Sequence, residues 1–200
     1  MRRSRHICLT IALLALAGAA KASASPTLVV KVSPTTASGE LASGYTIAGT
    51  IGKAKCEAGS DVLAGVYRCF AGNFVYDPCW ALSASPTPAV VCLPTPWATK
   101  ATQLDLSAPL EPSEAGPLIV WGIKLATGQR CAALQGAHGS FKGHFVNFAC
   151  NHHLDLLGKP DRAHAGWTIR ELHLGEHGHD SYGPVESIAK VWYGLGSVAP

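Results

Sequence analysis

The cysteines constrain what this chain can fold into more than any other feature of its sequence. Of its 7 cysteines, Cys8 lies in an N-terminal apolar run and six lie between positions 56 and 150. An even number of cysteines in an exported chain predicts disulfides, because thiols outside the cytoplasm are oxidised. The spacing contains no C-x-x-C pair, which a zinc site or a thioredoxin-like redox site would need. We therefore interpret the six cysteines as a disulfide framework.

The spacing of the cysteines favours pairing in sequence order. Twelve residues lie between Cys56 and Cys69, and twelve also lie between Cys79 and Cys92. Eighteen residues lie between Cys131 and Cys150. Bridges over loops of this size each remove roughly 3 kcal/mol of entropy from the unfolded chain. The predicted disulfides are Cys56–Cys69, Cys79–Cys92 and Cys131–Cys150.

The N-terminus has the pattern of a secretory signal peptide. A basic start, MRRSRH, precedes an apolar run of about fourteen residues and a small-x-small motif at Ala22-Ser23-Ala24. The run is too short for a transmembrane helix, which needs about twenty residues. We therefore expect residues 1–24 to be removed, and the mature chain to be secreted or periplasmic, with no membrane span.

Removal of the signal peptide reverses the sign of the net charge. Without Arg2, Arg3, Arg5 and Lys21, the count of Lys plus Arg falls from 16 to 12 against 13 Asp plus Glu, which gives a net charge of −1. A chain with no basic excess has little electrostatic attraction for nucleic acid or anionic lipid. We expect no nucleic-acid partner.

The mature chain divides into an arm and one domain. Residues 25–44 are rich in Ser, Thr, Pro and Gly and contain one strand-like run, Leu28–Val32, so we interpret them as an arm. Residues 45–196 have the size of a single domain with its own core. We expect this domain to contain all three disulfides.

Apolar residues in this domain recur mostly with a period of two. Examples are Tyr45, Ile47 and Ile51, and the run LIVWGIKL at residues 118–125. Such alternation predicts half-buried strands separated by Gly and Pro turns. Two segments fit more than one structure. Residues 60–65 could form one helical turn capped by Ser60, and VESIAKVWY at residues 185–193 matches either a helix or a strand. The sequence predicts a mainly β fold: a single compact antiparallel-sheet domain stapled by three disulfides, with at most one or two short helices.

Two turn signals lie between the second and third framework cysteines. Gly72-Asn73 tolerates positive φ, and Asp77-Pro78 favours turn initiation. We expect a turn at each pair, with Asp77 capping the second; the alternative is a catalytic role for this carboxylate.

Motifs across most of the domain resemble those of an uncharacterised bacterial exported domain with six ordered cysteines. The matching residues are YRC at 67–69, Gly72-Asn73, DPC at 77–79, Cys92 with Pro94 and Pro96-Trp97, Leu104-Asp105-Leu106, Pro109-Leu110, Trp121, Gly128 with Cys131, NFAC at 147–150, Trp167 and Trp192-Tyr193. That domain occurs as secreted proteins and as the extracytoplasmic part of some actinobacterial Ser/Thr kinases. The resemblance implies an external sensing or binding module and brings no activity with it.

Histidines are concentrated in the C-terminal part of the chain. All eight that follow the signal peptide lie from position 138 onward, and the segment HLGEHGHD is the densest. Imidazoles at i and i+2 share one face of a strand, so His177 and His179, with His173, are candidate ligands for a zinc or copper ion. Exposed loop histidines without a metal are the alternative, since Gly175 and Gly178 break the segment.

Trp97 is the candidate binding residue among the 5 tryptophans. It follows Pro-Thr-Pro in a loop, where an aromatic face can serve a ligand, whereas Trp121, Trp167 and Trp192 lie in apolar alternation and are expected in the core. Packing of Trp97 over a disulfide is the alternative.

No residue set matches a known catalytic motif, so no catalytic residue is assigned. Asp61 with Asp77, or Glu171 with Glu176, could act as a glycosidase-like pair of carboxylates, but sequence does not give their separation. We expect an exported binding module for an envelope component or a protein partner. A cell-envelope hydrolase using carboxylates or a histidine-bound metal is the alternative, and an extracellular metal-handling protein is a further one.

Overall fold

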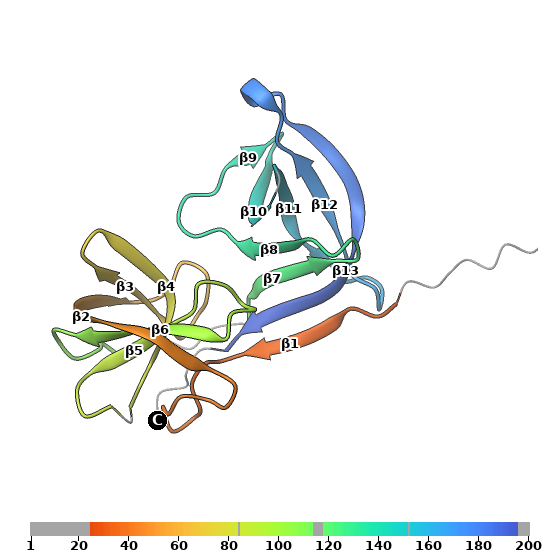
Figure 1. The fold of residues 1–200 in the computed structure, drawn as a ribbon. Coiled ribbons are helices and arrows are strands. Elements are labelled where there is room, and N and C mark those ends of the chain that lie inside the picture. Colours follow the sequence, from red (N-terminus) through yellow and green to blue (C-terminus); the bar gives the residue numbers. More distant parts are fainter. Residues whose placement is uncertain (1–24, 84, 114–117, 152, 196–200) are drawn as a thin grey trace, which may run out of the picture.

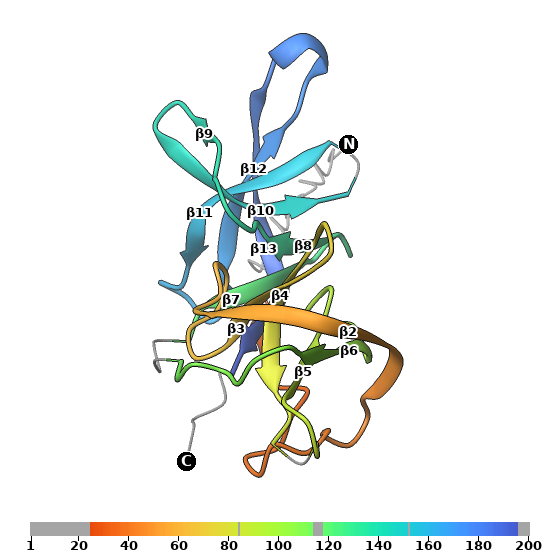
Figure 2. The same ribbon diagram turned by 90° about the vertical axis from the view of Figure 1, so that its left-hand side faces the viewer.

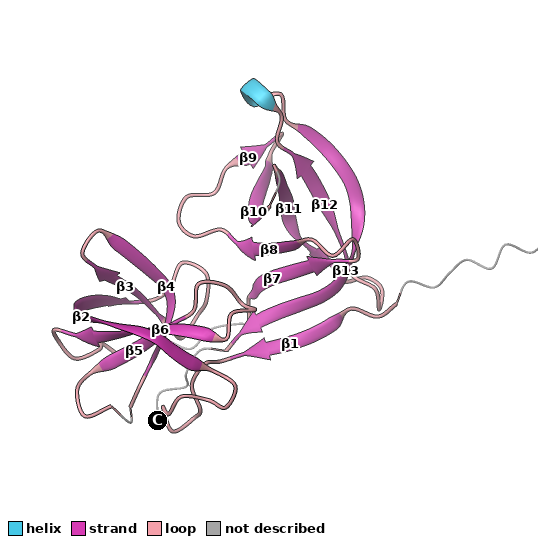
Figure 3. Ribbon diagram, viewed as in Figure 1, coloured by secondary structure: helices cyan, strands magenta, loops and turns pink. Residues whose placement is uncertain are grey.

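The computed structural model describes residues 25–83, 85–113, 118–151 and 153–195. Nearly all regular structure in these ranges is β-strand, and the only helical segment among them is a single 3-10 turn at Glu176–Gly178. Figures 1 and 3 show the strands gathered into two bodies that meet along one side. The mainly β fold predicted from sequence is confirmed. The boundaries proposed for the arm and the domain stay predictions.

The first body, here called the N-terminal barrel, is a closed barrel of five strands. Consecutive strands pair antiparallel, and the last strand pairs in parallel with the first to close the barrel. Its strands are β2 (Thr46–Ala58), β3 (Tyr67–Ala71), β4 (Phe74–Ala81), β5 (Ala89–Cys92) and β6 (Lys100–Leu106).

The second body, here called the C-terminal sheet, has eight strands. It curls until β7 meets β13, so that β13 pairs with β12 through its first half and with β7 through its second half. Its strands are β1 (Leu28–Val32), β7 (Val120–Leu125), β8 (Arg130–Ala133), β9 (Ser140–Phe141), β10 (His144–Cys150), β11 (Leu154–Asp161), β12 (Thr168–His173) and β13 (Ser181–Gly194).

Strand β1 lies within the predicted arm and belongs to the C-terminal sheet. It pairs in parallel with the second half of β13, and Val32 at its end is only 3% exposed. The Thr27 hydroxyl donates a hydrogen bond to the carbonyl oxygen of Ile188 at 2.7 Å. The first described strand is thus fixed to the last one.

Each disulfide joins two residues that lie directly opposite each other on antiparallel strands. The Cα atoms are 4.0–4.1 Å apart, as in the closely spaced pairs of an antiparallel ladder. Sequential pairing follows because the bridged strands are near neighbours in the chain. Three disulfides are compatible with an extracellular or otherwise oxidising environment. The bridges are Cys56–Cys69, Cys79–Cys92 and Cys131–Cys150, the pairs that the spacing predicts.

The two turn signals between Cys69 and Cys79 have different outcomes. Gly72-Asn73 forms the turn between β3 and β4, with Gly72 at a φ of 59°. The turn predicted at Asp77-Pro78 is wrong, since β4 continues through this cis peptide. Asp77 is instead buried in the strand, where its side chain holds the loop that precedes β3.

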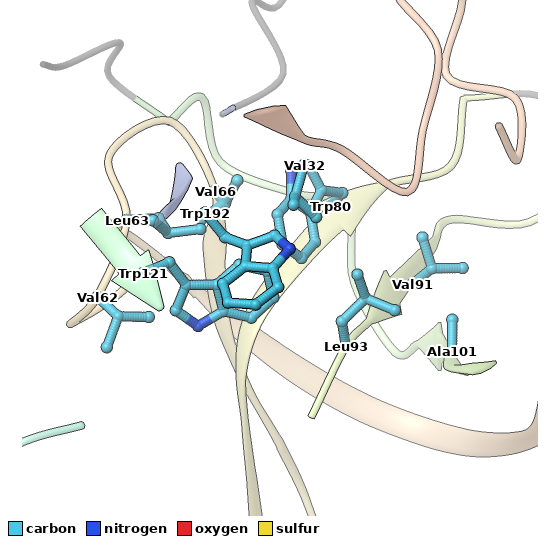
Figure 4. Close-up of a cluster of buried hydrophobic side chains, with 10 residues drawn as sticks. All are labelled: Val32, Val62, Leu63, Val66, Trp80, Val91, Leu93, Ala101, Trp121 and Trp192. Carbon is cyan, nitrogen blue, oxygen red and sulfur yellow. The ribbon is translucent and has the colours of Figure 1, made fainter. Parts of the chain in front are cut away.

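Two pairs of tryptophans join the bodies, and each pair has one member from each body. Trp80 of β4 lies 5.6 Å from Trp121 of β7, between ring centroids, and Trp97 of the β5–β6 loop lies 5.4 Å from Trp192 of β13. The Trp80 indole N–H also donates to the carbonyl oxygen of Leu195 at 2.6 Å. Figure 4 shows three of these rings within one buried cluster. The two bodies therefore share a core.

Two glycines permit this close approach. A Cβ atom at Gly122 would lie 2.3 Å from the side chain of Pro96, and one at Gly194 would lie 2.1 Å from that of Leu63. Both glycines belong to the C-terminal sheet, and both side chains that they accommodate belong to the N-terminal barrel. A larger residue at either position would push the bodies apart.

No helix among the described residues is both long and apolar enough to cross a membrane.

Replacing Trp80 should test the shared core. Trp80 is fully buried, so Trp80→Ala should lower the free energy of unfolding by about 3–5 kcal/mol. Phe74, 70% exposed beside the β3–β4 turn, offers a matched control, and Phe74→Ala should change stability by no more than about 0.5 kcal/mol. Urea unfolding with the disulfides intact measures both values. Equal costs for the two variants would contradict the shared core.

Candidate functional site

A cleft of about 340 Å³ lies where the two bodies meet. The loop between β2 and β3 forms one wall, and the C-terminal sheet forms the rest. Clefts between packed units are frequent ligand sites. The lining residues are Asp61, Val62, Leu118, Ile119, Val120, Ala133, Leu134, His138, Asn147, Phe148, Lys159, Pro160 and Arg162.

A hydrogen-bonded turn positions Asp61 at the cleft. The Ser60 hydroxyl oxygen accepts hydrogen bonds from the backbone N–H groups of Val62 and Leu63, both at 3.1 Å. This is the capping that the sequence suggested for Ser60, but the segment forms turns and no helix. The Asp61 carboxylate pairs with the Arg68 guanidinium at 2.6 Å, so its charge is largely balanced.

The Asp77 carboxylate fixes this turn through hydrogen bonds, and Asp77 does not line the cleft. Its carboxylate accepts hydrogen bonds from the Ser60 hydroxyl and, at 2.9 Å, from the Asp61 backbone N–H. Asp77 is 4% exposed, and burial raises the pKa of its carboxyl above the ordinary value of 3.8, although the bond from Ser60 acts in the opposite direction. The role of Asp77 is to fix one wall of the cleft.

Two cations of the C-terminal sheet line the cleft. Lys159 belongs to β11, and Arg162 follows directly after it. The Arg162 guanidinium lies 4.7 Å from the centre of the Trp167 ring and 5.6 Å from that of Tyr193. Stacking on two aromatic rings limits the positions of the guanidinium group. The cleft thus has a prepositioned cationic side.

The cleft lining also contains apolar and polar groups. Leu118 and Ile119 are exposed large hydrophobic side chains, at 48% and 41%. Asn147 donates to the carbonyl oxygen of Gly158 at 3.0 Å, and its side-chain oxygen lies 3.3 Å from His138 Nδ1. A ligand with an apolar part and an anionic part would match this lining.

Trp97, the binding residue predicted from sequence, does not line this cleft. It is half-buried, packs on Trp192, and has the Arg130 guanidinium 5.6 Å from its ring centre. The tryptophan packs on another tryptophan across the junction, a contact that the sequence did not suggest.

The predicted metal ligands lie at the far end of the C-terminal sheet. His173 ends β12 and lies 3.1 Å from the Glu171 carboxylate, while His179 follows the 3-10 turn and is exposed. The side chain of His177 lies outside the described residues. Within the described ranges, no three His, Cys, Asp or Glu side chains gather as a metal site would require. The metal site stays a prediction.

Sequence reasoning missed Lys159, Arg162 and Asn147 as cleft residues. They come from the C-terminal sheet, whereas Asp61 comes from the barrel, so no local spacing relates them. The sequence offers one weak signal for these residues: Lys159 and Arg162 lie close together and shortly before Trp167, an aromatic residue on which a cation can stack.

No protein-family model, curated protein or solved structure matches this chain. The resemblance to the exported six-cysteine domain therefore stays a prediction.

Burial of Asp77 should make stability depend on pH. Because its folded-state pKa is raised, the folded chain holds the proton more tightly, and this contribution to stability is lost as pH rises above about 4. The melting temperature of the wild type minus that of Asp77→Asn should therefore fall between pH 4 and pH 7. Ser60→Ala should steepen this fall, since the Ser60 hydroxyl favours the charged carboxylate. If the melting temperature of the wild type minus that of Asp77→Asn instead rises between pH 4 and pH 7, the pKa of Asp77 is not raised in the folded chain.

Proposed function

We propose that this protein is an exported binding module whose cleft takes a ligand with an apolar body and an anionic group. The observation that carries the proposal is that exposed apolar side chains and two cations line the same cleft of about 340 Å³. The ligand is an envelope component, and binding involves no covalent chemistry.

The anionic group of the ligand is placed against Lys159 and Arg162. A guanidinium offers two parallel N–H donors to a carboxylate, and such charge-assisted bonds are about twice as strong as neutral ones. Asp61 does not oppose this contact, because Arg68 already pairs with it at 2.6 Å. The net charge that faces the ligand is positive.

The apolar body of the ligand is placed against Leu118 and Ile119. Covering apolar surface contributes about 25 cal/mol for each Å² removed from water. These side chains are 48% and 41% exposed, so they have surface left to cover. Burial of these two side chains strengthens binding, and the two cations favour anionic ligands over neutral or cationic ones.

Export is supported by the signal-peptide pattern of residues 1–24 and by the three disulfides. The resemblance to extracytoplasmic domains of membrane proteins agrees with a module that binds outside the cytoplasm. A hydrolase that uses Asp61 and Asp77 as its carboxylate pair is not favoured. Asp77 is buried and binds the backbone N–H of Asp61.

A matched series of ligands tests the charge requirement. Octanoate, octanol and octylammonium share one apolar chain and differ in charge. Octanoate should bind about tenfold more tightly than octanol, since a hydrogen bond to a charged group contributes about 1.5–3 kcal/mol, and octylammonium should bind most weakly. Calorimetric titration measures the three affinities.

Variants of the cleft complete this test. Arg162→Gln or Lys159→Ala should remove the preference for octanoate over octanol. Lys100→Ala is the matched control, because Lys100 is exposed at the start of β6, outside the cleft lining. Equal affinity for octanoate and octanol, or equal effects of Lys159→Ala and Lys100→Ala, would exclude the proposed site.

A metal-handling role is the second candidate, on the pair of His173 and Glu171, whose Nε2 and Oε2 atoms lie 3.1 Å apart. Within the described ranges no third His, Cys, Asp or Glu side chain joins this pair as a metal site would require. An imidazole and a carboxylate are ligands that zinc accepts, and copper also suits imidazole. If the role is correct, His173→Ala should weaken binding of Zn²⁺ or Cu²⁺ by at least about tenfold. His164, an exposed loop histidine, provides the matched control His164→Ala. Unchanged affinity in His173→Ala would eliminate this candidate.

A further inference from the structure

Three cationic side chains lie in one row across neighbouring strands of the C-terminal sheet. Lys190 of β13 lies directly opposite Lys124 of β7, and Lys124 lies directly opposite Arg130 of β8. Residues that lie opposite each other on paired strands have their side chains on the same face of the sheet. Figure 2 shows β7, β8 and β13 together in the part of this sheet nearest the N-terminal barrel. The three residues are here called the cation row.

Contacts with the junction tryptophans also place the two ends of the cation row on one face. The Arg130 guanidinium lies 5.6 Å from the centre of the Trp97 ring, and the Lys190 ammonium lies 5.4 Å from that of Trp192. The two rings pack on each other, with their centroids 5.4 Å apart. Stacking on an aromatic ring limits the positions of each cation. The ends of the row are therefore held beside this tryptophan pair.

The cation row has no anionic partner among the described residues. The ion pairs formed within these ranges lie elsewhere, at Asp61 and at Glu171. Lys124 and Lys190 are half-buried, so water screens their repulsion less than it would at a fully exposed site. Like charges directly opposite each other destabilise a sheet. The folded chain thus contains a repulsion that an anionic ligand would relieve.

We infer that the cation row binds an acidic polysaccharide, with the carboxylates of its uronic acids against the three cations. Neighbouring strands lie about 4.8 Å apart, so the row spans only about 10 Å and calls for several negative charges close together. None of the three cations lines the cleft between the two bodies. This site is therefore separate from the one in the proposed function.

The surroundings of the row favour a sugar chain over an acidic peptide. An extended peptide has its same-face side chains about 6.6 Å apart, which is wider than the spacing of the row. A uronic-acid chain has a carboxylate on every ring and an apolar C–H face on each ring as well. Trp97 is half-buried at one end of the row and offers an aromatic surface to such a ring.

Hexamers that differ in charge or in backbone test the class of ligand. Hexagalacturonate should bind the disulfide-bonded chain at least about tenfold more tightly than its methyl ester, which has the same rings without the charge, because charge-assisted hydrogen bonds are about twice as strong as neutral ones. It should also bind at least about tenfold more tightly than hexaglutamate, which has the same number of side-chain carboxylates on a peptide. Calorimetric titration at low ionic strength measures the three affinities. Equal binding of hexagalacturonate and its methyl ester, or equal or tighter binding of hexaglutamate, overturns the inference.

Replacing the middle cation separates binding from folding. Lys124→Gln should weaken binding of hexagalacturonate by about tenfold. The same variant should raise the melting temperature of the free chain by about 1–4 °C, because it removes the charge that repels both neighbours. Lys31 is exposed on β1, on the opposite face of the same sheet. The matched control Lys31→Gln should leave affinity unchanged within about twofold.

Two further comparisons complete the test. A lower melting temperature in Lys124→Gln, or equal losses of affinity in Lys124→Gln and Lys31→Gln, would show that the cation row is not a ligand site. Arg162→Gln in the cleft should leave the affinity for hexagalacturonate unchanged within about twofold, and Lys124→Gln should do the same for octanoate. Loss of hexagalacturonate binding in Arg162→Gln would assign this ligand to the cleft and overturn the inference.

Discussion

The packing of two tryptophan pairs across the junction is the interaction on which the rest of this structure depends. Each pair takes one ring from the N-terminal barrel and one from the C-terminal sheet, at centroid distances of 5.6 and 5.4 Å. Tilted aromatic pairs at such distances contribute about 0.5–1.5 kcal/mol beyond the area that they bury. Without these contacts the two bodies would be separate small domains, each with less buried surface for its size.

The cleft exists because this junction is fixed. One wall comes from the turn at Ser60 and Asp61, and the cationic side comes from Lys159 and Arg162 in the other body. Val62 connects the two features, since it belongs both to the shared core and to the cleft lining. The affinity for a ligand bound between the walls would therefore depend on the relative position of the two bodies, in addition to the side chains that the ligand contacts.

The sequence predicted those features that are local in the chain. The disulfides were predictable because each bridges strands that are close in sequence. Trp121 and Trp192 were predictable as core residues from their alternation, whereas Trp167, expected in the core with them, is half-buried. Contacts between distant segments left no such pattern. The division into two bodies, the packing of Trp97 on Trp192, and the cleft itself all arise from long-range pairing. The error at Asp77 has another origin. Hydrogen bonds from its carboxylate to a turn 16 residues earlier, a separation like that of the disulfides, hold it in a strand where Asp-Pro signals a turn.

The pairing of β1 with β13 also affects the order in which the chain can assemble. A chain synthesised from its N-terminus can form the N-terminal barrel early, since all five barrel strands lie before residue 107. Strand β1 precedes that barrel but has to wait for β13, as the bond between Thr27 and Ile188 spans 161 residues of sequence. Closing so long a loop is slow. Until β13 is made, β1 stays unpaired and open to chaperones and proteases.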